Sequence, residues 1–380
     1  MKRKTFNIMD YLTMRGDLSF EQSDFNSVDA LILSQIAYNN VDGLLSDDFK
    51  EKITLQELAD RFTVARNYQE RCNMGAMINP LTPQLMIAAA KSPRFSRVKV
   101  CGFINKINQK AVEQFSAMTF QLEKDRYVIA LRGTDDTIVG WHEDFNLGYM
   151  DEIPAQKDTQ AYVREAMAAL KGNFIITGHS KGGNLSVKGA MAVTPRSLSR
   201  LQAVYNFDGP GFFAPVYSQQ EFLKIKDRVY SYFPQFCVVG MMFEHTKQYK
   251  IVACSAEGIL QHDPFAWNVE GPGFESAPNF DQASDFFYSS FNDWASKLSP
   301  QERKRFIDTL FDVIYASGAR TNYEIDQNKI VCGGKMLAKF TELNEKERKS
   351  VLKAFKTFIK VAKDNIPMFS VFKPSTSLLK

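Results

Sequence analysis

The residues with the clearest chemical potential lie in one glycine-rich stretch, NFIITGHSKGGNLSVKGAM, at positions 173–191. An apolar run beginning at Phe174 leads into the pentapeptide G-H-S-K-G, whose serine is Ser180, and a segment containing Leu, Val and Ala follows it. This order predicts a strand, a sharp turn and a helix, the setting in which G-x-S-x-G raises a serine hydroxyl above the edge of a sheet. Glycine suits both flanks because such a turn is strained and leaves no room for a Cβ atom. Ser180 is therefore a candidate nucleophile if the sequence also supplies a base, an acid and oxyanion donors.

The base has to be a histidine, and the sequence contains only four. The chain order in α/β-hydrolases is serine, acid, histidine, which leaves His245 and His262 after Ser180. His262 lies in GILQHDPFAW, a loop-like segment after the apolar run YKIVACS, where a base following the last strand is expected. His245 ends the apolar run in MMFEHTKQY and fits a surface histidine equally well. We predict His262 as the base and His245 as its alternative, and either one can instead be a structural histidine bonded to the backbone.

The acid that orients the histidine is harder to find. Asp208, in VYNFDGPGF, lies at the carboxyl end of the strand predicted after the Ser180 helix, where open α/β sheets collect their functional groups. The next strand is the usual place for the acid, but residues 235–237 there contain no carboxylate. Other carboxylates come too late, stand at the wrong end of a strand or neighbour the histidine itself: Glu244, Asp227 and Asp263. We predict Asp208 as the third member, with a serine–histidine dyad as the alternative.

An oxyanion needs two hydrogen-bond donors. The backbone N–H of Lys181, at the N-terminus of the predicted helix, is the first candidate. The second is Thr134 in IALRGTDDTIVGWHEDF, which follows an apolar run that predicts a buried strand and offers both an N–H and a hydroxyl. The alternative for this segment is an ordinary Gly-Thr-Asp turn.

Composition predicts a folded protein without metal or nucleic-acid chemistry. Of the 380 residues, 44% are hydrophobic, which is enough for a substantial core, and the formal charge of +4 gives no case for binding nucleic acid. The five cysteines are scattered without a C-x-x-C pair, so we expect no disulfide framework, no zinc site and no cofactor. The N-terminal residues lack an apolar signal region and no apolar run approaches the length of a membrane span, so we expect a cytoplasmic protein.

Hydrophobic patterning divides the chain into three parts. Residues 1–95 predict a helical segment packed on the core. Residues 96–280 predict a hairpin with its turn near 123–125 and then alternating helices and strands, with one further strand candidate at 236–243. Such alternation favours a mostly parallel sheet covered by helices. Residues 281–380 predict a C-terminal helical extension, in which Ser299 and Glu302 form a capping box.

Several segments together resemble the class 3 lipase-like group of α/β-hydrolases: ALRGTDD with GWHEDF, ITGHSKGGNLSV, and YNFDGPGF. That group shares an R-G-T or R-G-S oxyanion segment, a W-x-x-D turn, a G-H-S-x-G-G elbow and a G-x-P segment after the next strand. The segments NIMDYLTMRGDLSF and QHDPFAW resemble, more closely, an uncharacterised bacterial family within the group, a domain of unknown function. The resemblance implies an α/β-hydrolase fold, a mostly parallel central sheet flanked by helices, with N-terminal and C-terminal helical extensions.

The resemblance also assigns roles: Ser180 as nucleophile, His262 as base, Thr134 and Lys181 as oxyanion donors, and Trp141 and Asp144 as supports of the Thr134 loop. The sequence departs from the group at two positions. The place of the triad aspartate in class 3 lipases corresponds to Cys237 or a neighbour, which puts a conventional triad in question. Lys181 replaces the common leucine, which suggests an acidic or polar acyl substrate.

Two functions follow as hypotheses. The first is a serine hydrolase (lipase- or esterase-like) that cleaves a small-molecule acyl ester or a lipid through a Ser180 acyl-enzyme. The second is a degenerate hydrolase that binds a lipid or protein without turnover, which the missing carboxylate near Cys237 motivates. The segment FKTFIKVAKDNIPMFSVFK, which mixes Phe and Lys, then suggests peripheral contact with a membrane surface. The alternative for this segment is a helix packed on the flank of the domain.

Overall fold

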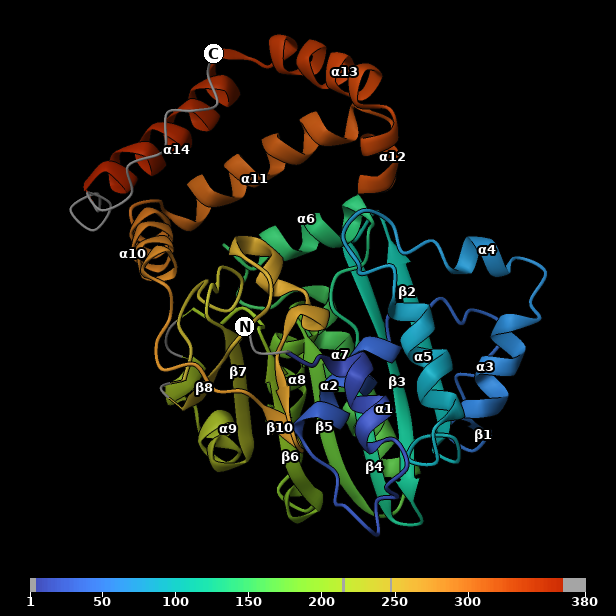
Figure 1. Ribbon diagram of the computed structural model, residues 1–380. Helices are drawn as coiled ribbons and strands as arrows, with labels where there is room; N and C mark the ends of the chain where they lie inside the picture. Colours follow the sequence, from blue (N-terminus) through green and yellow to red (C-terminus); the bar gives the residue numbers. More distant parts are fainter. Residues whose placement is uncertain (1–4, 214–215, 247, 365–380) are drawn as a thin grey trace.

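The computed structural model describes residues 5–213, 216–246 and 248–364. Its centre is an eight-stranded sheet in the order β1-β2-β3-β4-β5-β6-β7-β8 (Figure 1). Strands β1 to β4 pair antiparallel, and β4 to β8 pair parallel. The strands are β1 (Ile53–Thr54), β2 (Lys99–Asn108), β3 (Glu113–Glu123), β4 (Arg126–Leu131), β5 (Asn173–His179), β6 (Leu201–Phe207), β7 (Val229–Pro234) and β8 (Tyr249–Val252). A separate two-stranded sheet joins β9 (Val269–Glu270) to β10 (Gly273–Phe274).

Helices cover both faces of the sheet, and alternating residues of each strand face one set or the other. On one face, Val128 and Ala130 of β4 pack in a core with α1 (Ile8–Arg15), α2 (Ser27–Ile36), α3 (Leu55–Thr63) and α5 (Thr82–Lys91). On the other face, Ile129 and Leu131 pack with α7 (Pro154–Ala169) and α8 (Lys181–Met191). The apolar run of β4 is therefore buried on both sides, as the sequence predicts. Helix α6 (Ile138–Asn146) follows β4. The remaining elements before the C-terminal helices are short: α4 (Tyr68–Arg71), α9 (Gln220–Leu223) and the 3₁₀ turns η1 (Leu198–Arg200), η2 (Val216–Ser218), η3 (Lys226–Arg228), η4 (Gly258–His262) and η5 (Pro264–Ala266).

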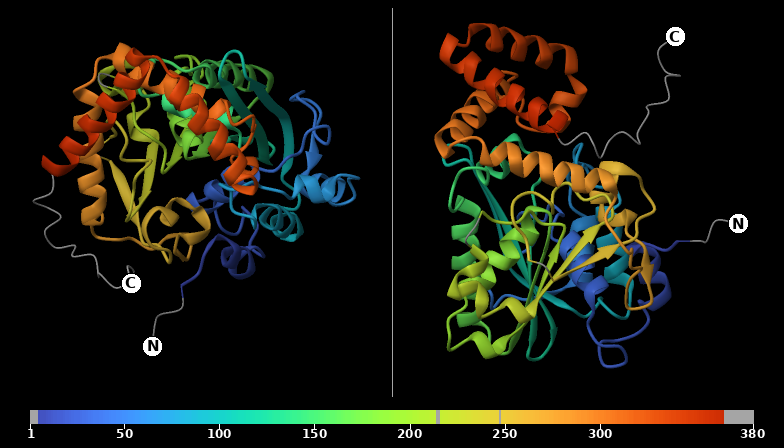
Figure 2. Two further views of the ribbon diagram at one scale, coloured as in Figure 1. Left: turned by 90° about the horizontal axis from the view of Figure 1, so that it is seen from above. Right: turned by 90° about the vertical axis from the view of Figure 1, so that its left-hand side faces the viewer.

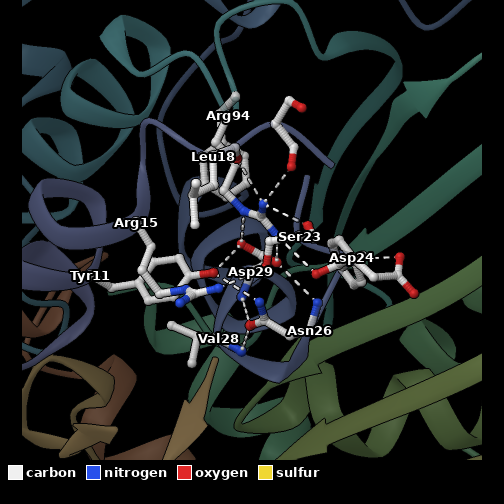
Figure 3. Close-up of polar contacts among 12 residues, drawn as sticks. Tyr11, Arg15, Leu18, Ser23, Asp24, Asn26, Val28, Asp29 and Arg94 are labelled. Carbon is white, nitrogen blue, oxygen red and sulfur yellow. Dashed lines mark hydrogen bonds and ion pairs between the residues drawn. The ribbon is translucent and has the colours of Figure 1, made fainter. Parts of the chain in front are cut away.

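A buried ion pair ties the N-terminal helices to one another (Figure 3). Arg94, in the turn after α5, contacts Asp29 of α2 through two hydrogen bonds of 2.5 and 2.7 Å. The same guanidinium donates to the carbonyl oxygens of Leu18 and Ser23, and the Tyr11 hydroxyl donates to Asp29. One side chain thus fixes the loop between α1 and α2. The division of the chain at residues 95 and 280 stays a prediction.

The strand predicted at 236–243 is wrong. These residues form turns between β7 and β8. Several of their backbone N–H groups bond to side chains rather than to a neighbouring strand: Cys237 N–H donates to the Ser284 hydroxyl and Gly240 N–H to Asp208. Apolar composition made this segment look like a strand, but it encloses a buried carboxylate.

The C-terminal helices lie beyond the carboxyl ends of the parallel strands (Figures 1 and 2). They are α10 (Gln282–Ser296), α11 (Pro300–Tyr315), α12 (Asn322–Gln327), α13 (Lys329–Glu342) and α14 (Glu345–Asp364). Ile307 and Phe311 of α11 pack on Ile138 of α6, and the predicted capping box of Ser299 and Glu302 is confirmed at the start of α11. No helix in the described ranges is long and apolar enough to cross a membrane. Residues 365–373 of the Phe- and Lys-rich segment lie outside the described part of the chain.

Candidate active site

Ser180 occupies a strained turn between β5 and α8. Its φ angle is +58°, a left-handed conformation that costs free energy for a residue with a side chain. The close packing of the turn explains its glycines, since a Cβ atom on Gly182 would lie 2.2 Å from the carbonyl oxygen of Leu131. The predicted strand, turn and helix are therefore confirmed, and the serine hydroxyl stands at the carboxyl end of β5.

Ser180, His262 and Asp208 form a continuous line of hydrogen bonds. Ser180 Oγ lies 3.0 Å from His262 Nε2, and His262 Nδ1 lies 2.6 Å from Asp208 Oδ2. The three residues come from the ends of β5 and β6 and from the 3₁₀ turn η4. Because a carboxylate accepts, Nδ1 carries the hydrogen, and Nε2 is left with a lone pair directed at the serine hydroxyl. This tautomer is the one that can take the proton from Ser180.

Asp208 is completely buried, and both oxygens of its carboxylate accept hydrogen bonds. Oδ1 accepts a hydrogen bond from the Gly240 N–H at 3.2 Å and from the Cys237 thiol at 2.9 Å, which leaves Oδ2 for His262. Burial, followed by the Asp208 charge, raises the pKa of the Cys237 thiol, so the thiol stays protonated and donates. The candidate acid thus lies at the end of β6, one strand earlier than the position expected from the sequence, and Cys237 hydrogen-bonds to it from that expected position.

A second histidine, His179, hydrogen-bonds to the backbone of His262. His179 Nε2 lies 2.9 Å from the carbonyl oxygen of His262 and therefore donates to it. Burial, and then the neighbouring His262, lower the pKa of His179 far below its usual range, so it is neutral. The Tyr38 hydroxyl donates to the His179 carbonyl oxygen at 3.3 Å. No pattern in the sequence connects His179 with His262, since the two residues meet only through the fold.

The alternative base, His245, lies elsewhere. Its ring packs against the aromatic rings of Phe233, Tyr249 and Tyr288, with centroid separations of 5.6 to 5.8 Å. Of the two histidines considered from the sequence, only His262 is brought to Ser180.

The loop after β4 lies directly against the serine turn. A Cβ atom on Gly133 would lie 2.5 Å from the carbonyl oxygen of His179 and 3.2 Å from Ser180 Cβ, so the next residue, Thr134, begins beside the nucleophile. The Thr134 hydroxyl donates to Asp144 Oδ2. Burial raises the pKa of Asp144 to about 6, against the opposing effect of the Lys181 charge. Trp141, expected to support this loop, instead packs with the apolar side chains that join α6 to α11.

The side chain of Lys181 points into the protein. It is 1% exposed, and its ammonium contacts Gln114 and Glu143. An ammonium in this position does not reach a substrate at Ser180. The suggestion that Lys181 selects an acidic or polar acyl group is therefore wrong, and Glu143, which sequence reasoning missed, is its partner. The only sequence signal for Glu143 was its place beside Asp144 in GWHEDF.

The chain has an α/β-hydrolase fold. Its defining features are the parallel strands β4 to β8, the serine turn between β5 and α8, and a serine, a carboxylate and a histidine beyond the carboxyl ends of the strands. Within the described residues, no cluster of three or more His, Cys, Asp or Glu side chains could hold a metal ion.

The chain belongs to the Mbeg1-like family, whose model matches residues 89–312. This range includes Ser180, Asp208 and His262, but not Tyr38. Among solved structures, the chain is similar to one described as the crystal structure of M37 lipase, with 16% sequence identity and a TM-score of 0.37, over 57% of this chain and 70% of that one. No curated protein sequence matches the chain.

Proposed function

We propose that the protein is a serine hydrolase that cleaves carboxylic esters through an acyl-enzyme on Ser180. The observation that carries this proposal is the line of hydrogen bonds from Ser180 through His262 to the buried Asp208. A serine held in a strained turn, a histidine in the accepting tautomer and a buried carboxylate behind it are the parts that acyl transfer by serine requires. We also propose, from the motifs that the chain shares with them, that the protein is related to the class 3 lipases.

In the first half of the reaction, His262 Nε2 takes the Ser180 proton while Oγ attacks the ester carbonyl carbon. Asp208 stabilises the imidazolium that forms and keeps the ring in place. The tetrahedral intermediate collapses, the ester C–O bond breaks, and the leaving alcohol takes the proton from His262. In the second half, His262 removes a proton from water, the resulting hydroxide attacks the acyl-enzyme, and Ser180 regains its proton as the carboxylic acid leaves.

The oxyanion of both intermediates would be bound by the backbone N–H groups of Lys181 and Thr134. The Lys181 N–H lies at the first turn of α8, where unpaired amides and the helix dipole favour negative charge. The loop carrying Thr134 lies beside the serine turn, as the close approach of Gly133 to Ser180 requires. Removing one such donor typically costs about 100- to 1000-fold in rate.

The exposed side chains around His262 favour a substrate with an apolar acyl group. Ile259 and Leu260, in the same 3₁₀ turn as His262, are largely exposed. The loop carrying exposed Met77 and Leu81 is tied to this turn, because Asn79 Nδ2 donates to Asp263 at 2.5 Å. Exposed apolar side chains on two linked loops beside the base favour a fatty acyl ester or lipid, and peripheral contact with a membrane, over a charged substrate.

The alternative of a binding module without turnover depended on the lack of a carboxylate near Cys237. Since Asp208 fills that role from β6 in this geometry, the hydrolase is the better-supported function.

Reaction of the purified protein with a fluorophosphonate probe tests the proposal. We expect labelling of the wild type and none of Ser180→Ala or His262→Ala, with His245→Ala labelled like the wild type. Hydrolysis of p-nitrophenyl esters from acetate to decanoate should then increase with chain length. A wild type that neither labels nor hydrolyses any of these esters would refute the proposal.

A further inference from the structure

A buried ion pair lies beneath the candidate oxyanion site. Lys181 Nζ is 2.9 Å from Glu143 Oε2, and the two side chains are 1% and 0% exposed. The same ammonium donates to the backbone oxygen of Gln114 at 2.9 Å and to its side-chain Oε1 at 2.7 Å. All three ammonium hydrogens are therefore used, and none is directed at a substrate.

Glu143 is satisfied as completely as Lys181. Its Oε2 also accepts the Gln114 N–H at 3.0 Å, and its Oε1 accepts the Ala155 N–H at 2.8 Å. The pair thus joins the first residue of α8 to α6, to the start of β3 and to the start of α7. Burying two charges costs several kcal/mol each, and an apolar pair of similar size often stabilises a fold equally well or better. Stability alone is therefore a weak reason for this pair.

The position of the pair relative to the two oxyanion donors suggests a different role. Lys181 itself carries the first donor, its backbone N–H. Glu143 precedes Asp144, which accepts the hydroxyl hydrogen of Thr134, the second donor residue, and Asp144 Oδ1 is 3.7 Å from the Lys181 ammonium. One side chain therefore links the helix that carries the first donor to the helix that holds the second.

We propose that the side chain of Lys181 is a positioning residue, which holds the Thr134 loop at a fixed distance from Ser180 by binding α6 through Glu143. This inference rests on the proposed hydrolase function and adds a role for a residue that touches no substrate. Oxyanion donors act only when they are already in place, and an error of about 1 Å can cost about 100-fold in rate.

The test compares Lys181→Met with Lys188→Met. Lys188 is a matched control, since it lies on the same helix and forms an ion pair with Glu152 at 3.0 Å, away from Thr134. We expect the second-order rate of fluorophosphonate labelling to fall about 30- to 100-fold in Lys181→Met. In Lys188→Met it should stay within about 2-fold.

Stability and positioning are separated by the double variant Lys181→Met/Glu143→Gln, which removes both charges of the buried pair. Its melting temperature should lie above that of Lys181→Met but below that of the wild type, because a glutamine at 143 has one oxygen for the two backbone N–H groups that Glu143 accepts, which costs about 1–3 kcal/mol. Its labelling should stay slow because the link to α8 is gone. A stable double variant that labels at the wild-type rate would overturn the proposal. The proposal would also be overturned if the losses of labelling rate in Asp144→Asn and Lys181→Met simply multiplied in the variant that carries both. Two residues that position the same loop should together cost less than the product of their separate effects.

A readout without catalysis distinguishes failure of this inference from failure of the proposed function. We expect amide hydrogen exchange in residues 132–138 to accelerate at least about 10-fold in the double variant and to be unchanged in Lys188→Met. Unchanged exchange in the double variant refutes the positioning role even if the wild type labels. Accelerated exchange with an unreactive wild type supports the positioning role and refutes the hydrolase.

Discussion

Replacing Asp208 by asparagine tests the line of hydrogen bonds most directly, because the structure fixes which way the new amide must face. Oδ1 accepts two hydrogen bonds, from the Gly240 N–H and the Cys237 thiol. The amide oxygen of the variant has to stay there, since an NH₂ group in that place would oppose two donors and lose about 1–3 kcal/mol. The NH₂ group is then directed at His262 Nδ1, 2.6 Å away in the native protein.

An NH₂ group donates, so Nδ1 must become an acceptor and the hydrogen must move to Nε2. In this tautomer His262 cannot take the proton of Ser180. We therefore expect Asp208→Asn to lower kcat/KM for a p-nitrophenyl ester by about 1000- to 10,000-fold, as a wrong histidine tautomer does in serine proteases. This factor corresponds to about 4–5.5 kcal/mol of transition-state stabilisation.

The matched control is Asp263→Asn, which changes the neighbouring carboxylate, bonded to Asn79 and to the Phe265 N–H. We expect this variant to keep activity within about 3-fold, because the Asp263 carboxylate bonds to Asn79 and the Phe265 N–H and not to Ser180 or the His262 ring. Both variants are assayed for ester hydrolysis and for probe labelling after thermal melts show that they are folded. Asp208→Asn with more than a tenth of the wild-type activity, or Asp263→Asn with an equal loss, would refute the reasoning.

Three further predictions concern stability. Burial lowers the pKa of His142, which stacks on Phe311, to about 4. Between about pH 6.5 and 4 the imidazole is therefore protonated only in the unfolded state, and the free energy of unfolding falls across that window by about 3 kcal/mol. The pH dependence measured by urea unfolding should lose this contribution in His142→Phe. Gly182→Ala should cost at least about 1–3 kcal/mol by overpacking, whereas Gly333→Ala, on an open face of α13, should gain about 0.5–1 kcal/mol in thermal unfolding. Arg94→Met leaves the buried carboxylate of Asp29 without its cation and should cost about 3–5 kcal/mol in urea unfolding.

Each of these has a clear contrary result. An unchanged pH dependence in His142→Phe would mean that other groups cause the loss of stability in acid. A Gly182→Ala variant as stable as Gly333→Ala would mean that α8 can move away from β4. A loss below about 1 kcal/mol in Arg94→Met would place the Asp29 carboxylate in contact with water.

Much of the local structure follows from the sequence because it depends on neighbouring residues. The hairpin turn predicted near 123–125 is confirmed, with β3 ending at Glu123 and β4 beginning at Arg126. The turn around Ser180 is confirmed for the same reason, since glycines flank a residue that must adopt a left-handed conformation. The strand predicted at 236–243 failed because apolar composition does not report whether a neighbouring strand is free to pair.

The contacts of the candidate site were only partly predictable. The choice of His262 over His245 followed from chain order, and the structure brings His262 to Ser180. The choice of Asp208 was one of two alternatives, because no pattern in the sequence gives the direction of a side chain at the end of a strand. Cys237 looked like a missing acid, but in the fold it donates to the acid that comes from the preceding strand.

The sequence by itself determined the strand–turn–helix that carries Ser180, the small set of histidines and carboxylates available to it, and the alternation that makes a mostly parallel sheet. Only the tertiary structure decided which of them meet. Ser180 and His262 are 82 positions apart, Asp208 and His262 are 54, and Lys181 and Glu143 are 38. Those contacts depend on the order of the strands and on which groups lose their water on burial. Both are properties of the packed chain, whereas turn and helix preferences belong to a few adjacent residues.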